Sequence, residues 1–350
     1  MPRILDRRPL RAALTIATVV AVGASLAACS SSSSDSSASD SSSSKVTTLN
    51  YQTSWIPLVQ FGGSYVAAKE GYYTDNKVKV NILAGGPDVD GMALLESGKA
   101  DIAVSNPDVV ALANAQAGGN LVIIAAGFQK SPLAVMSLSS DPIKTPADMK
   151  GKTIGVPTGD TASDAAFAKI NKITGDYKTV PVSFDAAPLL SGDVDGQYVF
   201  ATEQPIAVEE AGKTPVTMLV ADHNMSEYAQ VYVVTKETLK TKRAAIEGFL
   251  KGEIKGWQDY VTDPTEAVKL TVNDYGKSGG LTIKEQTRQA ELQMPIIETA
   301  TTKANGLLWM SKSDIATNVK TIKALGVDSD ASLFDTSLLK DIYKGKSSLK

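Results

Sequence analysis

The chain has 350 residues, a formal net charge of −3, one cysteine and one histidine. Residues 1–28 carry a net charge of +3, so the remainder carries −6 and keeps only Arg243 and Arg288 as arginines. Such a mildly acidic chain is a poor candidate for nucleic-acid binding, which favours basic patches. A single cysteine excludes a disulfide framework and a Cys/His zinc site. The 306 residues from Lys45 onward exceed the size at which single cores usually divide, so we expect two lobes.

The N-terminal segment has the order typical of an export signal. Four arginines lie within the first 11 residues, and an apolar run over residues 12–28 follows them. This run is short for a membrane-spanning helix, which needs about 20 apolar residues. Its end, Leu26-Ala-Ala-Cys29, resembles the lipobox of bacterial lipoproteins, in which the cysteine is lipidated and becomes the new N-terminus. We therefore expect residues 1–28 to be a signal peptide, and Cys29 to anchor the exported protein to the outer face of the cell membrane.

A lone cysteine can instead be a catalytic nucleophile or an inert core residue. Cys29 is followed by a serine-rich tract, and the only histidine, His223, is almost 200 residues away. Nothing in this neighbourhood holds the thiol beside a base, so the lipid anchor is the favoured interpretation. We expect residues 29–45 to be a disordered, flexible tether. His223 is interpreted as an ordinary loop residue, because no partner is spaced to make it catalytic.

From residue 46, short β-like runs alternate with longer helical patterns, which predicts an α/β fold with mainly parallel sheets. The first series predicts strands over residues 47–53, 78–83, 100–105 and 121–128, and helices over residues 61–73, 88–99 and 107–119. The run 121–128 is continuously apolar, as expected of a buried strand. Gly118 and Gly119 are positioned to stop the third helix. Residues 131–138 predict a strand that leaves this unit.

The second series predicts a helical turn over residues 145–151, strands over 152–157, 178–184, 196–201 and 214–220, and helices over 161–173 and 204–212. Thr161-Ala-Ser-Asp164 has the spacing of a capping box, with Asp in place of Glu. Residues 229–239 are interpreted as the return crossover, after which the pattern is helical to the end. Crossings near residues 135 and 232 predict a discontinuous first lobe, residues 46–134 plus 235–350, and a second lobe, residues 135–234.

Several stretches resemble one family of proteins in their collinear order. They are TSWIPLVQFGGSYVAAKEGYY (53–73), GKADIAVS (98–105), TPADMKGKTIGVPTGDTAS (145–163), FATEQPIAVEEAGK (200–213) and EGFLKGEIKGWQDYVTDPTEAVKLTV (247–272). This order, after a lipobox, is similar to that of the SsuA/THI5-like (NMT1/THI5) group of substrate-binding proteins. The resemblance covers essentially residues 46–330.

The resemblance implies a type 2 periplasmic-binding-protein fold: two α/β lobes joined by two crossover strands, with the ligand cleft between them. It implies that the chain closes on a small molecule and delivers it to the permease and ATPase subunits of an ABC importer. The predicted α/β pattern also supports a ligand site, because open α/β sheets bind ligands beyond the carboxyl ends of their strands and between lobes. We expect a monomer that performs no chemistry on its ligand and needs neither a cofactor nor a metal.

The stretches just beyond the predicted strand ends supply an aromatic side chain, amides, hydroxyls and acids. The candidate ligand-binding residues are Trp55, Gln60, Asp88, Asn106, Thr158, Thr161, Tyr198, Glu203, Gln204 and Tyr228. Each type has a structural alternative: the aromatic residues pack over the core, the amides and Asp88 form turns, and the threonines and Glu203 cap helices.

These stretches contain no arginine or lysine, which disfavours an anion and favours a small, largely neutral heterocycle, most like the pyrimidine precursor of thiamine. The helix N-terminus near Thr161 keeps a sulfonate, taurine or nitrate open as the alternative. Eukaryotic members of the group are pyrimidine-making enzymes that rely on a histidine and a cysteine-rich, iron-associated motif. This chain has no cysteine for such a site, and His223 lies outside a matching stretch, so an enzyme is disfavoured. A surface adhesin or sensor with the same two-lobe shape stays open.

Overall fold

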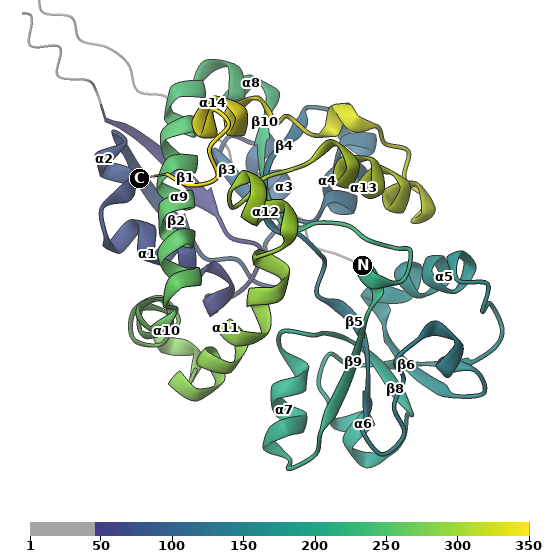
Figure 1. Ribbon diagram of the computed structural model, residues 1–350. Coiled ribbons are helices and arrows are strands. Elements are labelled where there is room, and N and C mark those ends of the chain that lie inside the picture. Colours follow the sequence, from purple (N-terminus) through teal and green to yellow (C-terminus); the bar gives the residue numbers. More distant parts are fainter. Residues whose placement is uncertain (1–45, 350) are drawn as a thin grey trace, which may run out of the picture. The chain divides into compact units, whose positions relative to one another are not determined.

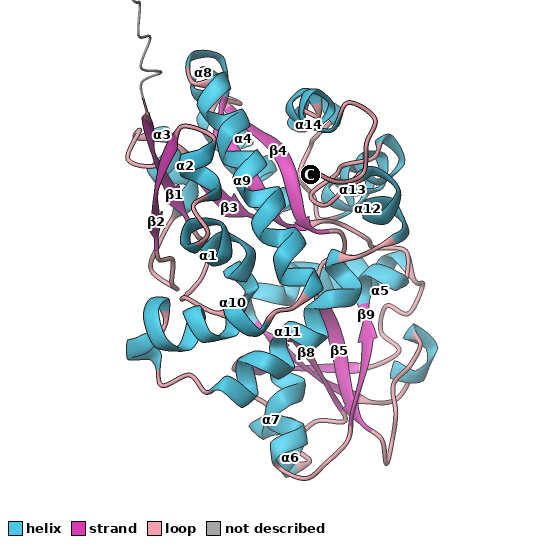
Figure 2. Cartoon of the chain, turned by 60° about the vertical axis from the view of Figure 1, so that its left-hand side comes forward, coloured by secondary structure: helices cyan, strands magenta, loops and turns pink. Residues whose placement is uncertain are grey.

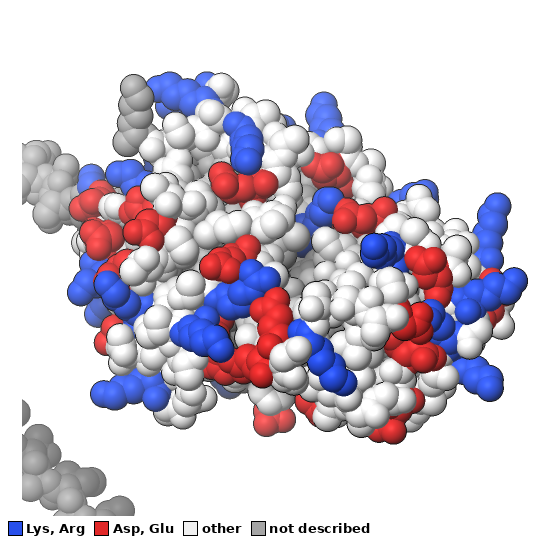
Figure 3. Space-filling view, turned by 60° about the horizontal axis from the view of Figure 1, so that its bottom comes forward, with Lys and Arg blue, Asp and Glu red and all other residues white. Residues whose placement is uncertain are grey.

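The computed structural model describes residues 46–349 (Figure 1). The predicted signal peptide, Cys29 and the serine-rich tether all lie outside these described residues. Within residues 46–349, no helix combines the length and the apolar character that crossing a membrane requires. On the face seen in Figure 3, acidic and basic side chains are intermixed and form no extended patch of one sign.

The first of two five-stranded sheets has the strand order β2-β1-β3-β10-β4. Its strands are β1 (Thr47–Gln52), β2 (Val78–Leu83), β3 (Ile102–Ser105), β4 (Leu121–Phe128) and β10 (Ala229–Thr235). β1 is parallel to β2 and β3, whereas β10 runs antiparallel to β3 and β4. The prediction that the continuous apolar run 121–128 forms a buried strand is confirmed, because all eight residues of β4 are buried. Gly118 ends the preceding helix with φ 89°, the left-handed conformation that its predicted role as a stop requires.

The second sheet has the strand order β7-β6-β8-β5-β9. Its strands are β5 (Leu133–Leu138), β6 (Thr153–Pro157), β7 (Lys178–Val182), β8 (Gly196–Phe200) and β9 (Pro215–Leu219). β6 is parallel to β7 and β8, and β5 runs antiparallel to β8 and β9. Each sheet therefore has four strands that run in one direction and one antiparallel strand that enters from the other sheet. The sheets have separate apolar cores, one around the first and one on each face of the second.

The chain crosses between the sheets twice, from β4 to β5 and from β9 to β10. The two crossings are neighbours, because the amide of Ser131 donates a hydrogen bond to the carbonyl of Glu227 (2.8 Å). β10 pairs with the first sheet along its length, from Ala229 opposite Phe128 to Thr235 opposite Leu121. The second crossing therefore comes before Ala229, whereas the sequence indicated residue 232 and a lobe boundary at 234.

Helices cover both sheets (Figure 2). They are α1 (Gly62–Lys69), α2 (Tyr72–Asp75), α3 (Gly91–Glu96), α4 (Pro107–Ala117), α5 (Thr161–Ile170), α6 (Ala187–Ser191), α7 (Gln204–Glu210), α8 (Lys236–Thr241), α9 (Arg243–Thr262), α10 (Thr265–Leu270), α11 (Ile283–Ile297), α12 (Ala300–Asn305), α13 (Lys312–Ala324) and α14 (Ser337–Tyr343). The packing of α9 on α1 requires a small residue. A Cβ at Gly256 would meet the carbonyl of Gly63 and lie 2.8 Å from the amide nitrogen of Ala67.

The start of α5 differs from the predicted capping box. Thr161 is already helical, and its hydroxyl donates to the carbonyl of Thr158 (2.9 Å). Asp164 accepts a hydrogen bond from the Tyr177 hydroxyl (2.5 Å), so its carboxylate is used by a residue beyond the helix. The capping-box prediction is wrong because this tertiary contact replaces the local one.

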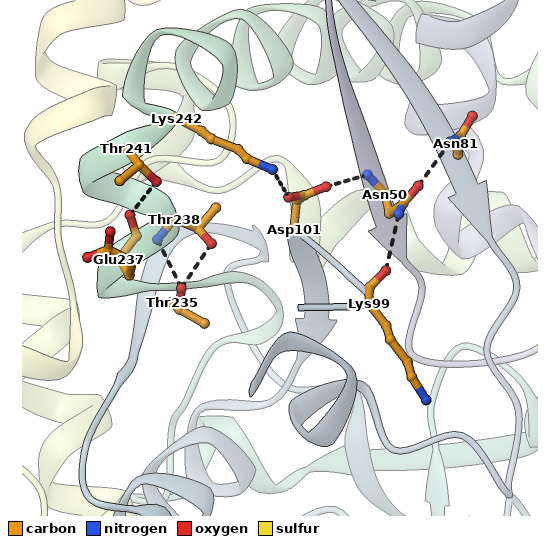
Figure 4. A network of polar contacts seen from close by, with 9 residues as sticks. All are labelled: Asn50, Asn81, Lys99, Asp101, Thr235, Glu237, Thr238, Thr241 and Lys242. Carbon is orange, nitrogen blue, oxygen red and sulfur yellow. Dashed lines mark hydrogen bonds and ion pairs between the residues drawn. The ribbon is translucent and has the colours of Figure 1, made fainter. Parts of the chain in front are cut away.

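A polar network closes the amino edge of the first sheet (Figure 4). Asp101 accepts a hydrogen bond from the amide of Asn50 (2.8 Å) and pairs with Nζ of Lys242 (2.6 Å). At the same edge, the Thr235 hydroxyl accepts a hydrogen bond from the Thr238 amide (2.9 Å) and caps α8. These groups satisfy one another, so this edge is occupied by structural contacts.

Candidate functional site

The candidate site lies along the carboxyl ends of the parallel strands. The antiparallel strands that enter from the crossings begin at these same edges, since Val231 lies opposite Ser105 and Leu133 lies opposite Phe200. Loops that follow parallel strands and segments that precede β5 and β10 are thus brought together. Ligands in open α/β sheets bind at such edges.

Large apolar side chains stand exposed at these edges. Of nine such side chains among the described residues, six end a parallel strand or follow one closely: Trp55, Ile56, Leu83, Val89, Val109 and Phe184. Trp55 is 39% exposed and Phe184 is 47% exposed, which is unusual for rings of this size. A gathering of exposed apolar groups marks a place where a ligand or partner binds.

A cavity of about 450 Å³ opens at the edge of the first sheet. Its walls include Ser54 after β1, Asp88 and Val89 after β2, and Ser105 and Val109 at the end of β3 and the start of α4. This volume lies within the range of about 300–1,000 Å³ typical of small-molecule sites. The cavity places the predicted residue Asp88 beside two of the exposed apolar side chains.

Three carboxylates from separate segments influence one another near this edge. Asp108 lies in the first turn of α4, Asp160 lies just before α5, and Glu227 lies just before β10. Burial, and then the charge of Asp108, raise the pKa of Asp160 to about 6. Burial, and then the charge of Asp108, also raise the pKa of Glu227 well above its usual value. The charge of Asp108 therefore acts on both of the other carboxyl groups.

Each of these carboxylates has a buried oxygen that accepts no hydrogen bond: Oδ1 of Asp108, Oδ2 of Asp160 and Oε2 of Glu227. None takes part in an ion pair among the described residues. Leaving a buried acceptor unsatisfied costs about 1–3 kcal/mol, and more for a charged group. Within residues 46–349 no group of acids, cysteine and histidine is arranged to hold a metal ion. The three carboxylates can therefore accept hydrogen bonds from a bound molecule.

Two further predicted residues lie close to this edge: Glu203 is partly buried and Tyr198 is fully buried. Burial raises the pKa of Glu203, which precedes α7, to about 7. Tyr198 on β8 is fully buried, and its hydroxyl has no hydrogen-bond partner. Burial, with the charges of Asp164 and Asp160 as smaller causes, raises the pKa of Tyr198 well above its usual value, so the hydroxyl lies near both carboxylates.

The other predicted residues fall into two groups. Asn106, Thr158 and Thr161 are exposed at strand ends, and Gln60 is mostly buried in the turn before α1. Gln204 and Tyr228 have structural partners. Oε1 of Gln204 accepts a hydrogen bond from the amide of Phe200 (2.8 Å), and the Tyr228 ring packs at 6.4 Å from the ring of Phe334. Ligand contact at all ten predicted positions stays a prediction, and these two are the weakest members.

Sequence reasoning missed Asp108, Glu227 and Phe184. Asp108 and Phe184 follow predicted strands closely, so their positions were available from the pattern. Glu227 precedes a strand, and only the antiparallel direction of β10 brings it to the carboxyl edge. The sequence analysis also did not consider Lys130, which lies at the first crossing. Its Nζ is 2.5 Å from Oδ1 of Asp222, so its charge is already paired.

Residues 59–267 match a family described as NMT1/THI5 like. The formylaminopyrimidine-binding protein of Halalkalibacterium halodurans is 26% identical over 248 residues, which cover 68% of this chain and 74% of the relative. Riboflavin-binding protein RibY of Chloroflexus aurantiacus is 24% identical over 249 residues (68% and 70% of the two chains). The 4-amino-5-hydroxymethyl-2-methylpyrimidine phosphate synthase of Schizosaccharomyces pombe is 24% identical over 253 residues (68% and 72%).

Among solved structures, the periplasmic aliphatic sulphonate-binding protein SsuA of Escherichia coli has a TM-score of 0.60 at 14% identity, covering 79% of this chain and 91% of that chain. This likeness confirms the predicted two-lobe fold of periplasmic binding proteins. The family match covers more than half of the residues, from the turn Val59–Phe61 through the whole second sheet to α10. The chain therefore belongs to the NMT1/THI5-like family.

Proposed function

We propose that this chain is the extracytoplasmic solute-binding component of an ABC importer and that it captures a small aromatic heterocycle. The observation that carries this proposal is a cavity of about 450 Å³ at the carboxyl edge of the first sheet, together with large apolar side chains, Trp55 and Phe184 among them, that are exposed just beyond the carboxyl ends of parallel strands. A planar ring placed there buries apolar area and gains about 0.5–1.5 kcal/mol from each favourable aromatic contact. Two relatives named for binding a formylaminopyrimidine and riboflavin support a ring as the ligand.

The charges at the site favour a ring with hydrogen-bond donors over a sulfonate or nitrate. Asp88 lines the cavity, and Asp108, Asp160 and Glu227 have no basic partner. An anion 4 Å from one ionised carboxylate is repelled by about 4 kcal/mol at an effective dielectric constant of 20. Lys130 offers little compensation, because Asp222 already holds its ammonium group.

The protein would bind and release its solute without chemical change. A synthase like the fission-yeast relative would need reactive side chains, and the only cysteine, Cys29, is reserved for the lipid anchor in this proposal. Contacts from both lobes would favour a closed form, which the permease recognises. The lobes would be residues 46–128 with the chain from Ala229 onward, and residues 133–219. The chain would act as a monomer, tethered to the outer face of the membrane through Cys29.

The test is a thermal-shift panel that contains pyrimidines, flavins, purines, taurine, alkylsulfonates and nitrate. A ligand at a hundred times its dissociation constant stabilises the folded state by about 2.7 kcal/mol, which gives a readable shift in Tm. We expect a response to at least one ring compound and none to the anions. A response to taurine or nitrate alone would overturn the ligand class and leave a binding protein of the sulfonate type. Scattering with the responding compound should then show a more compact molecule, and an unchanged radius would argue for a rigid sensor or adhesin.

A further inference from the structure

The loop that presents Trp55 runs from the end of β1 to the turn Val59–Phe61, which leads into α1. On the side of β1, the carbonyl of Trp55 accepts hydrogen bonds from the amide of Gly85 (3.1 Å) and the hydroxyl of Thr53 (3.2 Å). Within residues 46–349, no hydrogen bond reaches the backbone of the two residues that follow Trp55. The far side of the loop is therefore fixed by whatever holds the start of the turn.

The start of this turn has no local cap. Leu58 occupies the N-cap position, where Ser, Thr, Asp or Asn would supply a side-chain acceptor. The amide of Val59, a fully buried residue, instead donates a hydrogen bond to Oε1 of Gln286 (2.8 Å). Gln286 lies 227 residues further along the chain, in the first turn of α11, and is only 5% exposed. Because a buried amide without a partner is unfavourable, this distant side chain supplies the cap that the local sequence lacks.

Gln286 is carried by a well-fixed helix start. α11 begins with a capping box, in which the Thr282 hydroxyl accepts from the amide of Glu285 (3.2 Å) and the Glu285 carboxylate accepts from the amide of Thr282 (3.1 Å). The chain that leads into α11 also touches the loop directly, since a Cβ at Gly276 would lie 2.7 Å from the carbonyl oxygen of Pro57. A side chain can position a binding group only if it is itself held in place, and Gln286 meets this condition.

We propose that Gln286 is a positioning residue of the solute site: its bond to Val59 holds the loop in the arrangement that presents Trp55. The proposal rests on the proposed function of the carboxyl edges as a solute site, and it adds a residue that acts through the loop. A loop that is not fixed beforehand must be ordered when the solute binds, which weakens binding. The capped turn also contains Gln60, so the same bond fixes a second residue predicted to contact the ligand.

The first experiment needs no solute. The full chain, with its three tryptophans replaced by 5-fluorotryptophan, is studied in detergent by ¹⁹F NMR, and Trp55→Phe assigns the Trp55 resonance. Gln286→Met keeps a side chain of similar length without an oxygen acceptor, so it should shift or broaden the Trp55 resonance. Gln286→Glu keeps an oxygen acceptor and should leave this resonance near its wild-type position.

Gln293→Met is the matched control. Gln293 lies on the same helix, is fully buried, and accepts one hydrogen bond, from the Tyr260 hydroxyl (2.9 Å). The Tyr260 ring lies 5.0 Å from that of Trp257, so this variant should disturb the Trp257 resonance and leave that of Trp55 in place. A merely structural loss of one buried hydrogen bond would not distinguish the two glutamines.

The second experiment measures binding by calorimetry with riboflavin and a formylaminopyrimidine, the solutes in the names of two relatives. For a solute that the wild type binds, Gln286→Met should raise the dissociation constant about threefold to tenfold, and Gln293→Met should change it by less than about twofold.

Three results would overturn the positioning role: a Trp55 resonance that Gln286→Met leaves in place, one that Gln286→Glu or Gln293→Met displaces as far, or an unchanged dissociation constant in Gln286→Met. If neither these solutes nor the heterocycle panel bind the wild type, the proposed function fails, and the ¹⁹F resonances still decide whether Gln286 holds the loop.

Discussion

Glu203 allows the electrostatics of the site to be tested without any ligand. Burial raises the pKa of this carboxyl group to about 7 in the folded state, from 4.5 when it is solvated. A raised carboxyl pKa means that the folded state holds its proton more tightly than the unfolded state does. The free energy of unfolding should therefore fall as the pH rises from about 4.5 to about 7, and should stay low above that range.

The two pKa values determine the magnitude. A difference of about 2.5 units corresponds to about 3 kcal/mol between acidic and mildly basic pH, at 1.36 kcal/mol for each unit. Glu203→Gln places a neutral group of similar shape there and removes this dependence. We expect the variant to be about 2–3 kcal/mol more stable than the wild type near pH 8, and within about 0.5 kcal/mol of it near pH 4.

Urea unfolding of both proteins at several pH values measures this difference. Glu237→Gln is the matched control, because Glu237 is exposed on α8 and its replacement should change stability by less than about 0.5 kcal/mol at every pH. A Glu203→Gln variant that is equally stable at pH 8, or less stable, would show that the carboxylate is ionised and paired in the folded state. The burial argument for Glu203 would then be refuted.

Four further perturbations test other parts of the structure. Trp55→Ala should weaken binding of a responding heterocycle by about 2–4 kcal/mol in calorimetry, since about 100 Å² of exposed ring and its stacking are lost; unchanged affinity would remove Trp55 from the site. Arg288→Ala breaks two hydrogen bonds to Glu209 (2.9 and 3.0 Å) that join α11 to α7. The free energy of unfolding should fall by no more than about 1 kcal/mol, and scattering should show a more open unliganded form. An identical scattering profile would refute a role for Arg288 in holding the lobes together. Gly256→Ala should lower the unfolding free energy by more than about 1 kcal/mol in urea, because its Cβ meets the backbone of α1, and a neutral result would mean that the helices can separate freely. Cys29→Ala should move the protein out of the membrane fraction or leave the signal uncleaved, and unaltered fractionation with no acyl group on the wild type would end the anchor hypothesis.

The sequence by itself determined the fold class and most of the elements. Local patterns suffice where an element is buried on one face or both, as for the apolar run that became β4, and where backbone conformation demands a particular residue, as at Gly118. The positions of Trp55 and Asp88 at the carboxyl edge were also predictable, because both follow strands in the same parallel series. These features depend on residues close together in the chain.

The tertiary structure alone decided how distant charges meet. Glu227 reaches the edge only because β10 runs antiparallel, and the influence of Asp108 on Asp160 requires segments from both sheets to approach each other. Asp164 left its predicted capping role because Tyr177, 13 residues away, supplies a hydrogen bond. Burial of a carboxylate and the identity of its partners are properties of the packed molecule, since both depend on which groups exclude water from it. Sequence spacing carries no record of either.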